Sequence, residues 1–471
     1  MSAFGKIIQR PLSFISGEYG MAAVLVLLCI LFSVLTIEEK SPEGAQGAKS
    51  LAKDIIQLVE KDSSNFPKEL QIFIAAGEGK TGELFASSLK KELNYVGLEI
   101  KGIAVGNPPK VRKAIQSAGK IDLIATTASL KSLPVFDSFL GKTKYPLPTN
   151  STDINDTLIK GEDLILASPK TYLWPVFLTT VNLRNITSQI AVIAILAIGM
   201  TMVIITAGID LSVGSMIALS AVVAASIIEK MGGAAEAGTS VFLIASLAGV
   251  IVCTLSGAFT GIMVSQFSIP PFIATLAMMQ VLRGIAFKIA NNETISDVPA
   301  SFQWLGNGLS YGIPNCVILM IILYALAHIM MNKTTLGRYI YAIGANAEAS
   351  RMSGISPKNI KFIVYAICGA TAGLGGIVMA SQLQSGAGNY GVTYELMVIA
   401  AVVVGGTSLF GGKGKVLGTL IGAFIIAVIT NGMNLLLLGS ETQMIVLGLV
   451  ILVAILIERV RSGEWRNAVG G

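Results

Sequence analysis

Asp210 is the first candidate for a functional side chain in this sequence. It lies in the stretch Gly208-Ile209-Asp210-Leu211-Ser212-Val213-Gly214-Ser215, inside an apolar run from about Ile190 to Ile228 that is long enough for two membrane crossings. A carboxylate at the centre of a membrane helix costs about 2.5 to 3.5 kcal/mol, and such residues mark solute and ion pathways. Two explanations stay open: Asp210 acts directly in moving a solute, or it caps the second helix after a tight turn at the membrane surface.

The residues around Asp210 predict a break between two helices. Gly208 and Gly214 allow backbone conformations and close contacts that other residues resist. Ser212 and Ser215 can hydrogen-bond the backbone groups that a broken helix leaves free. Irregular backbone is stable in a membrane only where it is buried in protein or lines a wet cavity. We therefore take Gly208, Asp210, Ser212, Gly214 and Ser215 as candidate helix-break and pathway residues.

Composition places these residues in a polytopic membrane protein. Of 471 residues, 53% are hydrophobic and only 13% are charged, and the mean hydropathy is +0.71. A soluble protein needs more charge to cover its surface, so the lipid bilayer is the expected surrounding. The net charge of +6 agrees with Lys and Arg in cytoplasmic loops, and no nucleic-acid partner is expected. The four cysteines lack metal-ligand spacing, so no metal site is expected either.

Hydropathy predicts about ten transmembrane helices. The first lies in the N-terminal segment 1–39, and the others lie in the core 170–471, centred near residues 195, 220, 250, 280, 322, 372, 403, 427 and 450. An even number of crossings places both termini on one side of the membrane. The loop 332–361 is rich in Lys and Arg, whereas the charged residues of the facing loop 291–314 are acidic, so the basic loop and both termini are predicted to be cytoplasmic.

Residues 40–169 are charged and resemble soluble protein. Short apolar strands are predicted at 71–76, 98–105 and 121–125, and helices at 81–93, 109–117 and 130–140. This alternation indicates a small α/β insert domain with a parallel sheet, which the predicted topology places on the periplasmic side. The turn 77–81 is not a Walker A phosphate loop, because that pattern requires Gly where Ile74 stands.

The loop 332–361 is too polar to span a membrane and too long for a simple turn. Asn346 is predicted to cap a short helix over 347–352, which Gly354 and Pro357 end. A short cytoplasmic helix is what a membrane domain needs in order to receive motion from a soluble motor. The alternative is a solvated basic loop that only follows the charge rule for cytoplasmic loops.

Several motifs resemble those of the ribose- and galactose-type ABC transporter permeases, a monosaccharide permease family. They are TAGIDLSVGSMIALSA (206–221), PPFIATL (270–276), Arg283-Gly284, TTLGRYIYAIGANAEASRMSGI (334–355), YELMVIAAVVVGGTSLFGG (394–412) and NGMNLL (431–436). The resemblance covers about residues 185–458, and the insert domain is a departure from it. Ala207 also stands where many relatives have Gly.

The resemblance implies the membrane-spanning subunit of an importer, an all-α protein of the type II importer kind in the bacterial inner membrane. Glu348-Ala349-Ser350 with a Gly four residues later resembles the EAA-type coupling motif. By that resemblance the loop 332–361 docks on an ABC ATPase subunit, and the coupling residues are Gly337, Arg338, Glu348, Ala349, Arg351 and Gly354. A periplasmic solute-binding protein and a second permease copy are the other implied partners. The chain itself would bind no cofactor and carry no ATPase site, because ATP would be hydrolysed by the partner subunit.

Four amide side chains near the later spans are candidates for a solute pathway: Gln382, Gln384, Asn431 and Asn434. Amides suit brief contacts with a hydroxylated neutral solute, although hydrogen bonds between helices are the alternative. The predicted function is import of a ribose- or galactose-like monosaccharide. A permease for nucleosides or another small polar solute, and an ion-coupled secondary transporter, remain as alternatives; the latter would use intramembrane charges such as Asp210.

Overall fold

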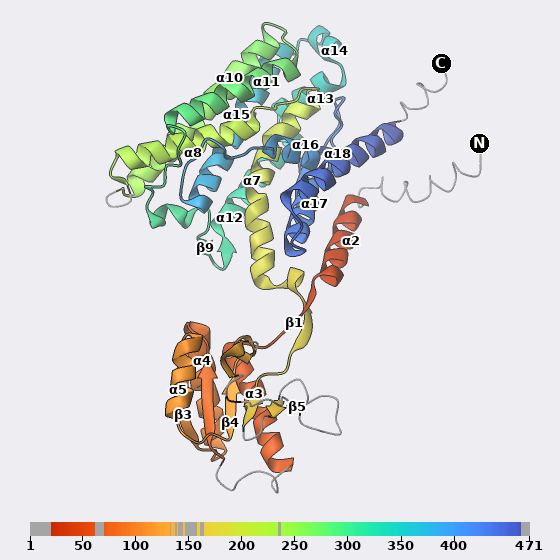
Figure 1. Cartoon of the computed structure of the whole chain (residues 1–471). Coiled ribbons are helices and arrows are strands. Elements are labelled where there is room, and N and C mark those ends of the chain that lie inside the picture. The colour runs from red at the N-terminus through yellow and green to blue at the C-terminus, as the bar shows by residue number, and fades with distance from the viewer. Residues whose placement is uncertain are drawn as a thin grey trace, which may run out of the picture. The chain divides into compact units, whose positions relative to one another are not determined.

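The computed structural model describes residues 20–61, 70–131, 133–136, 139, 145–146, 158–160, 164–233 and 237–462 (Figure 1). The chain divides into two compact units. One unit comprises residues 1–36 and 176–471, and the other comprises Ile37–Pro175. The basic N-terminal flank that contains Lys6 and Arg10 lies outside the described residues.

The first unit is a bundle of apolar helices. Within the described residues, seven helices are long and apolar enough to cross a membrane: α7 (Thr180–Ile205), α8 (Val213–Lys230), α10 (Thr239–Ser265), α11 (Pro271–Ile289), α12 (Asn315–Lys333), α15 (Pro357–Leu383) and α17 (Val416–Leu435). Three further apolar helices are shorter: α2 (Gly20–Leu35), α16 (Tyr394–Val404) and the apolar part, Ser440–Leu456, of α18 (Ser440–Ser462). These helices lie where the spans are predicted, and the fold class of a polytopic helical protein with an α/β insert is confirmed.

The span predicted near residue 403 has an unexpected form. The α16 helix contains 11 residues, which corresponds to about 16 Å, roughly half of the hydrocarbon thickness of a bilayer. The residues between the end of α15 and the start of α16, 384–393, are not helical. This span is therefore an irregular segment followed by a half-length helix.

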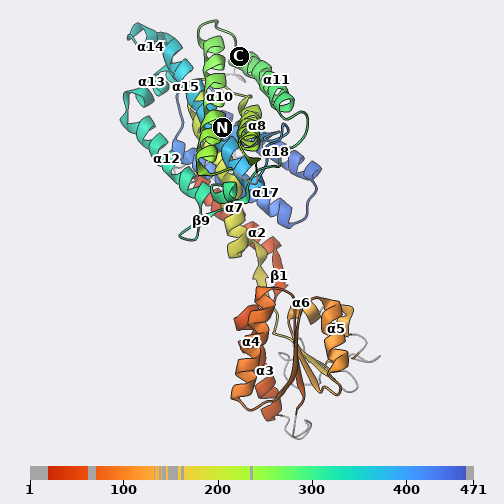
Figure 2. The same cartoon turned by 90° about the vertical axis from the view of Figure 1, so that its left-hand side faces the viewer.

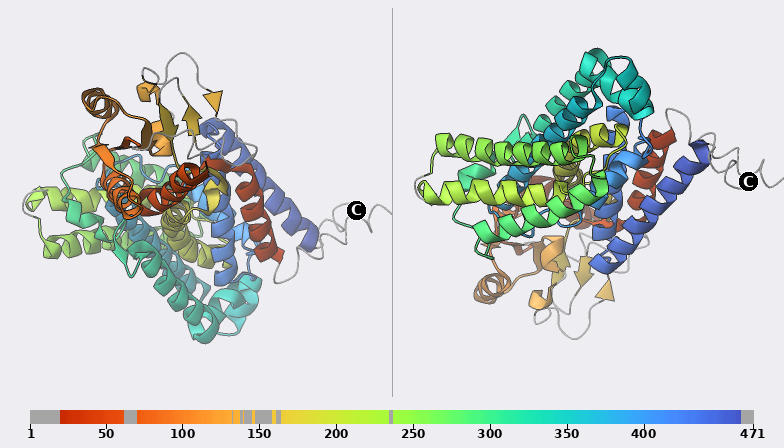
Figure 3. Two further views of the ribbon diagram at one scale, coloured as in Figure 1. Left: turned by 90° about the horizontal axis from the view of Figure 1, so that it is seen from below. Right: turned by 90° about the horizontal axis from the view of Figure 1, so that it is seen from above.

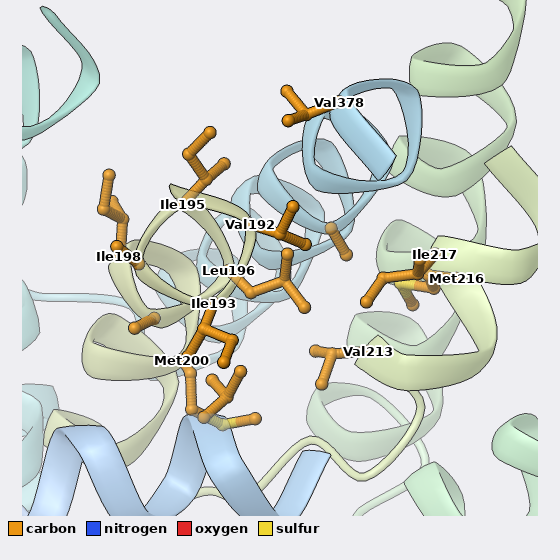
Figure 4. Close-up of a cluster of buried hydrophobic side chains, with 14 of the residues drawn as sticks. Val192, Ile193, Ile195, Leu196, Ile198, Met200, Val213, Met216, Ile217 and Val378 are labelled. Carbon is orange, nitrogen blue, oxygen red and sulfur yellow. The ribbon is translucent and has the colours of Figure 1, made fainter. Parts of the chain in front are cut away.

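The centre of the bundle is α7. Every residue from Ile190 to Ile205 is buried, so this helix is apolar on all sides, as expected for a helix surrounded by protein. Figure 4 shows Val192 and Leu196 of α7 among side chains of α8 and α15. In Figure 3 the red α2 and dark-blue α18 lie on the opposite side of the bundle from the green α10 and α11.

The α10 and α15 helices lie side by side (Figures 1 and 3) because small residues line their contact. On α10 these residues recur every four positions: Gly249, Cys253, Gly257 and Gly261. A Cβ on Gly257 would collide with the carbonyl oxygen of Tyr365, and a Cβ on Gly369 of α15 would collide with the carbonyl oxygen of Cys253. Backbones this close rely on van der Waals contact, which is the main attraction between helices in lipid.

Gly369→Leu should prevent normal folding, because the added side chain would push α10 and α15 apart. Overpacking alone costs about 1 to 3 kcal/mol, and here the clash is with backbone. Gly448→Leu on α18 is the matched control, since nothing lies within 4 Å of a Cβ at that position. Size-exclusion chromatography of the detergent-solubilised protein should show aggregation for Gly369→Leu only. A monodisperse Gly369→Leu protein with an unchanged melting temperature would contradict this account of the contact.

The insert domain contains a six-stranded sheet with the order β3-β2-β4-β7-β6-β5. The strands are β2 (Ile72–Ala76), β3 (Ile100–Val105), β4 (Leu123–Thr126), β5 (Tyr145–Pro146), β6 (Leu158–Lys160) and β7 (Ile165–Ala167). The pairs β2–β3, β2–β4 and β4–β7 are parallel, and β6–β7 and β5–β6 are antiparallel. A separate antiparallel pair joins β1 (Ile37–Lys40) to β8 (Tyr172–Pro175).

Helices cover both faces of this sheet. The helices α3 (Gly44–Lys61) and α4 (Lys80–Tyr95) lie on one face, and α5 (Pro108–Ser117) lies on the other (Figure 2). Leu51, Phe85 and Leu89 pack on the first face, and Val111 and Ile115 on the second. Strands β2, β3 and β4 and helices α4 and α5 lie where they were predicted, whereas α3 and β5 to β7 were not predicted.

The helix predicted over 130–140 is interrupted. Its described part consists of the end of α6 (Ala128–Lys131) and the 3-10 helix η1 (Pro134–Phe136). Pro134 explains the break, since proline lacks an amide hydrogen and disfavours helix at the residue before it.

The remaining elements of the bundle are short and precede or connect its long helices. They are η2 (Val176–Leu178), η3 (Ala300–Trp304), β9 (Leu309–Ser310), β10 (Ile313–Pro314), α13 (Thr335–Ala345) and α14 (Ala347–Met352). The last two lie in the predicted coupling loop, and α14 has the predicted bounds.

Candidate functional site

The end of α7 explains the helix break in backbone terms. The amide of Gly208 donates to the carbonyl of Val203 at 3.0 Å, and the amide of Ala207 donates to that of Ile204 at 2.9 Å. This pair of bonds is the Schellman arrangement, which requires a left-handed residue after the helix. Ala207 has that conformation, with φ of 58°. The position therefore favours glycine, which has no Cβ to hinder a left-handed conformation.

Asp210 is fully buried within the break. Its Oδ1 atom accepts hydrogen bonds from the backbone amide of Ser212 at 2.9 Å and from the Ser212 hydroxyl at 2.5 Å. The N-cap of α8 is Ser212, so the expectation that Asp210 caps this helix is wrong. Asp210 instead braces the turn that precedes the helix, because its carboxylate reaches the amide of the cap residue rather than those of the first helical turn.

The two glycines of the break allow close contact with α15 and α16. A Cβ on Gly208 would lie 2.7 Å from the hydroxyl oxygen of Tyr365, and that hydroxyl donates to the carbonyl of Ile209 at 3.4 Å. A Cβ on Gly214 would collide with the carboxylate of Glu395. Other side chains at these two positions would therefore separate the break from the helices that support it.

Three buried polar atoms near the start of α8 have no hydrogen-bond partner among the described residues. They are Asp210 Oδ2, Ser215 Oγ and Glu395 Oε2. The Cys368 thiol on α15 faces the same Asp210 carboxyl. Unpaired buried polar atoms are rare in folded proteins and require an explanation.

The coupling loop is built from two capped helices. Thr334 caps α13 by accepting from the amide of Gly337 at 3.3 Å. Asn346 caps α14 by accepting from the amides of Glu348 and Ala349 at 3.0 and 2.9 Å. The cap predicted from the sequence is thus present, and it holds a short helix at a fixed place.

The α14 helix presents an almost entirely exposed surface. Of its residues only Ser350 is buried. Glu348 and Arg351 form an ion pair at 2.6 Å whose side chains are 69% and 66% exposed. Exposed ion pairs contribute little to stability, so these charges are available to a partner. Arg338 on α13 is exposed as well.

The coupling loop contacts the helix break directly. The Gly344 position on α13 is so close to Ile205, the last residue of α7, that a Cβ would collide with the Ile205 carbonyl oxygen. The amide of Gly412 donates to this same carbonyl at 2.9 Å, and the hydroxyl of Tyr341 donates to the carbonyl of Gly414 at 2.8 Å. The end of α13 therefore packs directly against the end of α7, where the break starts.

The four candidate pathway amides all make hydrogen bonds within the protein. Gln382 donates to the carbonyl of Ser188 at 2.9 Å, and Gln384 donates to that of Val298 at 2.8 Å. Asn431 exchanges two hydrogen bonds with Asn182 on α7, at 2.9 and 3.0 Å. These bonds tie helices and loops together.

Asn434 differs from the other three in its surroundings. It is exposed and accepts from the Gln443 side chain at 2.8 Å. The four amides do not form a single cluster, because the first two bond to residues near α7 and the α11–α12 loop, whereas this one bonds to α18. A pathway role for the four remains a prediction.

Sequence reasoning missed two charged residues as site candidates. Arg283 on α11 donates through Nη1 to the carbonyls of Gly388 and Tyr390, at 2.9 and 2.5 Å. Its charge interacts with that of Glu395 on α16. The available signal was a charge inside an apolar run, which is the same signal that identified Asp210.

Comparison with known proteins identifies the family. Residues 182–455 match the family described as branched-chain amino acid transport system / permease component. The chain belongs to this permease family. The matched range contains the helix break, the coupling loop and both newly found charges, whereas the insert domain lies outside it. No solved structure matches the chain.

Individual relatives of this permease are named for sugars. It is 46% identical to a ribose import permease protein of Escherichia coli (strain K12) over 63% of the chain and 91% of the relative. It is 35% identical to a D-allose transport system permease protein of the same strain, over 61% of the chain and 86% of the relative. An L-arabinose transport system permease protein of that strain is 33% identical, over 62% of the chain and 87% of the relative.

Proposed function

We propose that this permease is the membrane-spanning subunit of an ABC importer that translocates a ribose-like monosaccharide, driven by ATP hydrolysis on a separate subunit. The observation that carries the proposal is the 46% identity to a ribose import permease over 91% of that protein. The family description mentions branched-chain amino acids, but the similarity to three permeases named for sugars favours a monosaccharide.

The proposed partners follow from the same similarity. An ATPase subunit docks on the exposed surface of α14 and the adjoining residues of α13, in the cytoplasm. A solute-binding protein delivers the sugar on the periplasmic side of the inner membrane, and a second permease copy completes the pathway. The contact between Gly344 and Ile205 supports this proposal, because it connects the docking surface to the helix break.

Alternating access requires an element with two arrangements that the motor can bias. The break at residues 206–212 suits this role, since its backbone bonds are local and its flanking glycines set the distance to α15 and α16. In this mechanism the ATPase moves α14 and α13, and α13 displaces the carbonyl end of α7. The solute is then exposed alternately to the two sides.

Uptake and copurification together test the proposal. Cells that express the complete system should accumulate labelled D-ribose, and the tagged permease from native membranes should carry an ATPase subunit and a solute-binding protein. A preference for nucleosides or branched-chain amino acids over every pentose and hexose would overturn the assigned substrate. Undiminished uptake after deletion of the ATPase would instead indicate an ion-coupled secondary transporter.

The insert domain is proposed to assist the solute-binding protein at the pathway entrance. The chain can be shortened there without strain, because Lys40 of β1 pairs with Tyr172 of β8 and Thr36 accepts from the amide of Val176 at 2.8 Å. Joining these two strands by Asn-Gly in place of residues 41–171 should give a two-residue hairpin.

The shortened permease should reach the membrane normally but take up sugar at least about threefold more slowly at limiting binding-protein concentration. The reason is the loss of a contact surface rather than of the pathway. Binding-protein affinity and uptake rate are the two measurements. If both equal those of the full-length permease, the insert has no part in transport and is a tolerated insertion.

A further inference from the structure

The segment 384–393 runs along α8 without forming a helix. Close contacts place it there: a Cβ on Gly386 would lie 2.6 Å from the Ala221 carbonyl oxygen, and one on Gly391 would lie 2.9 Å from Cβ of Ile217. Both contacts are with a helix long and apolar enough to cross the membrane. Irregular backbone at membrane depth is tolerated only inside protein or beside a water-filled cavity.

Two helices begin at this segment. The α16 helix starts at Tyr394, directly after it, and α8 starts at Val213, beside Gly391. Helix N-termini carry partial positive charge and free amide donors. Glu395 lies at both starts, since it is in the first turn of α16 and contacts Gly214 of α8. Its Oε2 atom is buried against Gly214 and has no hydrogen-bond partner among the described residues.

Arg283, whose charge is opposite to that of Glu395, lies beside the same segment. Its guanidinium holds the segment by donating to the carbonyls of Gly388 and Tyr390, and it interacts with Glu395. Both charged residues are only partly buried. Exposed apolar residues flank them: Val281, Ile285, Val392 and Leu396. We call the group formed by Arg283, Gly214 and residues 384–396 the charged junction.

The charged junction contains two partly exposed charged residues, whereas α10 contains none. Large exposed side chains along α10 are all apolar: Leu243, Ile244, Leu247, Ile251, Leu255 and Phe259. That surface suits lipid. A partly exposed arginine and glutamate facing lipid would be strongly unfavourable, because ionised groups lose their hydration there. Charges within membrane proteins accordingly face the protein interior or water.

We propose that the charged junction lines the water-filled solute pathway, with Glu395 accepting from and Arg283 donating to the hydroxyls of the passing sugar. The proposal rests on the function proposed above, and the second permease copy closes the pathway around the junction. A carboxylate is an acceptor and a guanidinium a fixed fork of donors, so together they match the mixed donor and acceptor character of a sugar. Glu395 and Arg283 are both partly exposed, and together with the two helix starts they supply polar groups that are already in place.

Cysteine labelling tests where water reaches. In a variant without its native cysteines, Val392→Cys and Leu396→Cys are compared with Leu247→Cys on α10; the three positions are 53%, 50% and 61% exposed. A water-soluble, thiolate-specific methanethiosulfonate reagent is applied to the protein in lipid nanodiscs. Both junction cysteines should react at least tenfold faster than the α10 cysteine, because thiolates form in water and not in lipid. Equal rates would overturn the proposal.

Uptake measurements test the contact with the solute. Glu395→Gln should lower the maximal uptake rate of D-ribose at least tenfold at normal membrane abundance, whereas Glu293→Gln, in the loop after α11, should not. Wild-type rates for Glu395→Gln would overturn the role of this carboxylate. If the wild-type permease takes up no monosaccharide, the proposed function fails, but the labelling contrast still decides whether the junction is wet.

Discussion

Gly354→Trp should abolish monosaccharide uptake while the protein remains in the membrane at normal abundance. Gly354 has φ of 84°, and nothing lies within 4 Å of a Cβ at this position. The strain of a left-handed tryptophan is about 1 to 2 kcal/mol, which the folded permease should tolerate. The large side chain would instead occupy the exposed surface beside α14, where we propose that the ATPase docks.

Gly312→Trp is the matched control for this experiment. Gly312 has φ of 81° and an equally open environment, but it lies in the loop between α11 and α12, which is predicted to face the other side of the membrane. Its uptake should stay near that of the wild type. Normal uptake by Gly354→Trp, or equal loss in both variants, would contradict docking at α14. Glu348→Lys should resemble Gly354→Trp, because it reverses an exposed charge on the same helix.

Asp210→Leu should nearly eliminate transport, whereas Asp210→Asn should have a mild effect. Asparagine retains the oxygen that accepts from the Ser212 amide and hydroxyl. Leucine leaves both donors buried without a partner, at a cost of about 1 to 3 kcal/mol each. The bracing observed in the structure favours this outcome over a role for the charge itself.

The comparison of uptake by the two Asp210 variants decides between the two roles. If Asp210→Asn is as defective as Asp210→Leu at equal membrane abundance, the charge is needed for transport. The unpaired Oδ2 atom and the facing Cys368 thiol would then be the place to look for the interaction that requires it.

Local features of the sequence were sufficient to predict the membrane helices, the helix break, α14 and part of the insert domain. Long apolar runs specify membrane helices because each must satisfy its own backbone hydrogen bonds in lipid. The glycines and the carboxylate around residue 210 identify the break, and Asn346 identifies the start of α14, because a cap acts on amides only two and three residues away. The same local signals located β2, β3 and β4 of the insert domain.

Contacts between distant parts of the chain were decided only by the tertiary structure. Asp210 was expected to cap α8, but the folded turn places Ser212 at that position and gives Asp210 a bracing role. Glu395 is 181 residues from Gly214 in sequence, yet its carboxylate lies against Gly214 in the fold. Short strands such as β5 and β6 have too few residues to carry a pattern, and they exist because neighbouring strands complete their hydrogen bonds.

The contact between the coupling loop and the helix break is the clearest example of a contact that only the tertiary structure decides. Both stretches are recognisable in the sequence, each from its own residues. Their contact depends on Gly344 meeting the Ile205 carbonyl, which no periodicity or motif encodes. The sequence alone therefore determined which segments cross the membrane, break and protrude. Only packing decided which of them touch, because side-chain volumes and backbone approach distances act between residues that the chain itself keeps far apart.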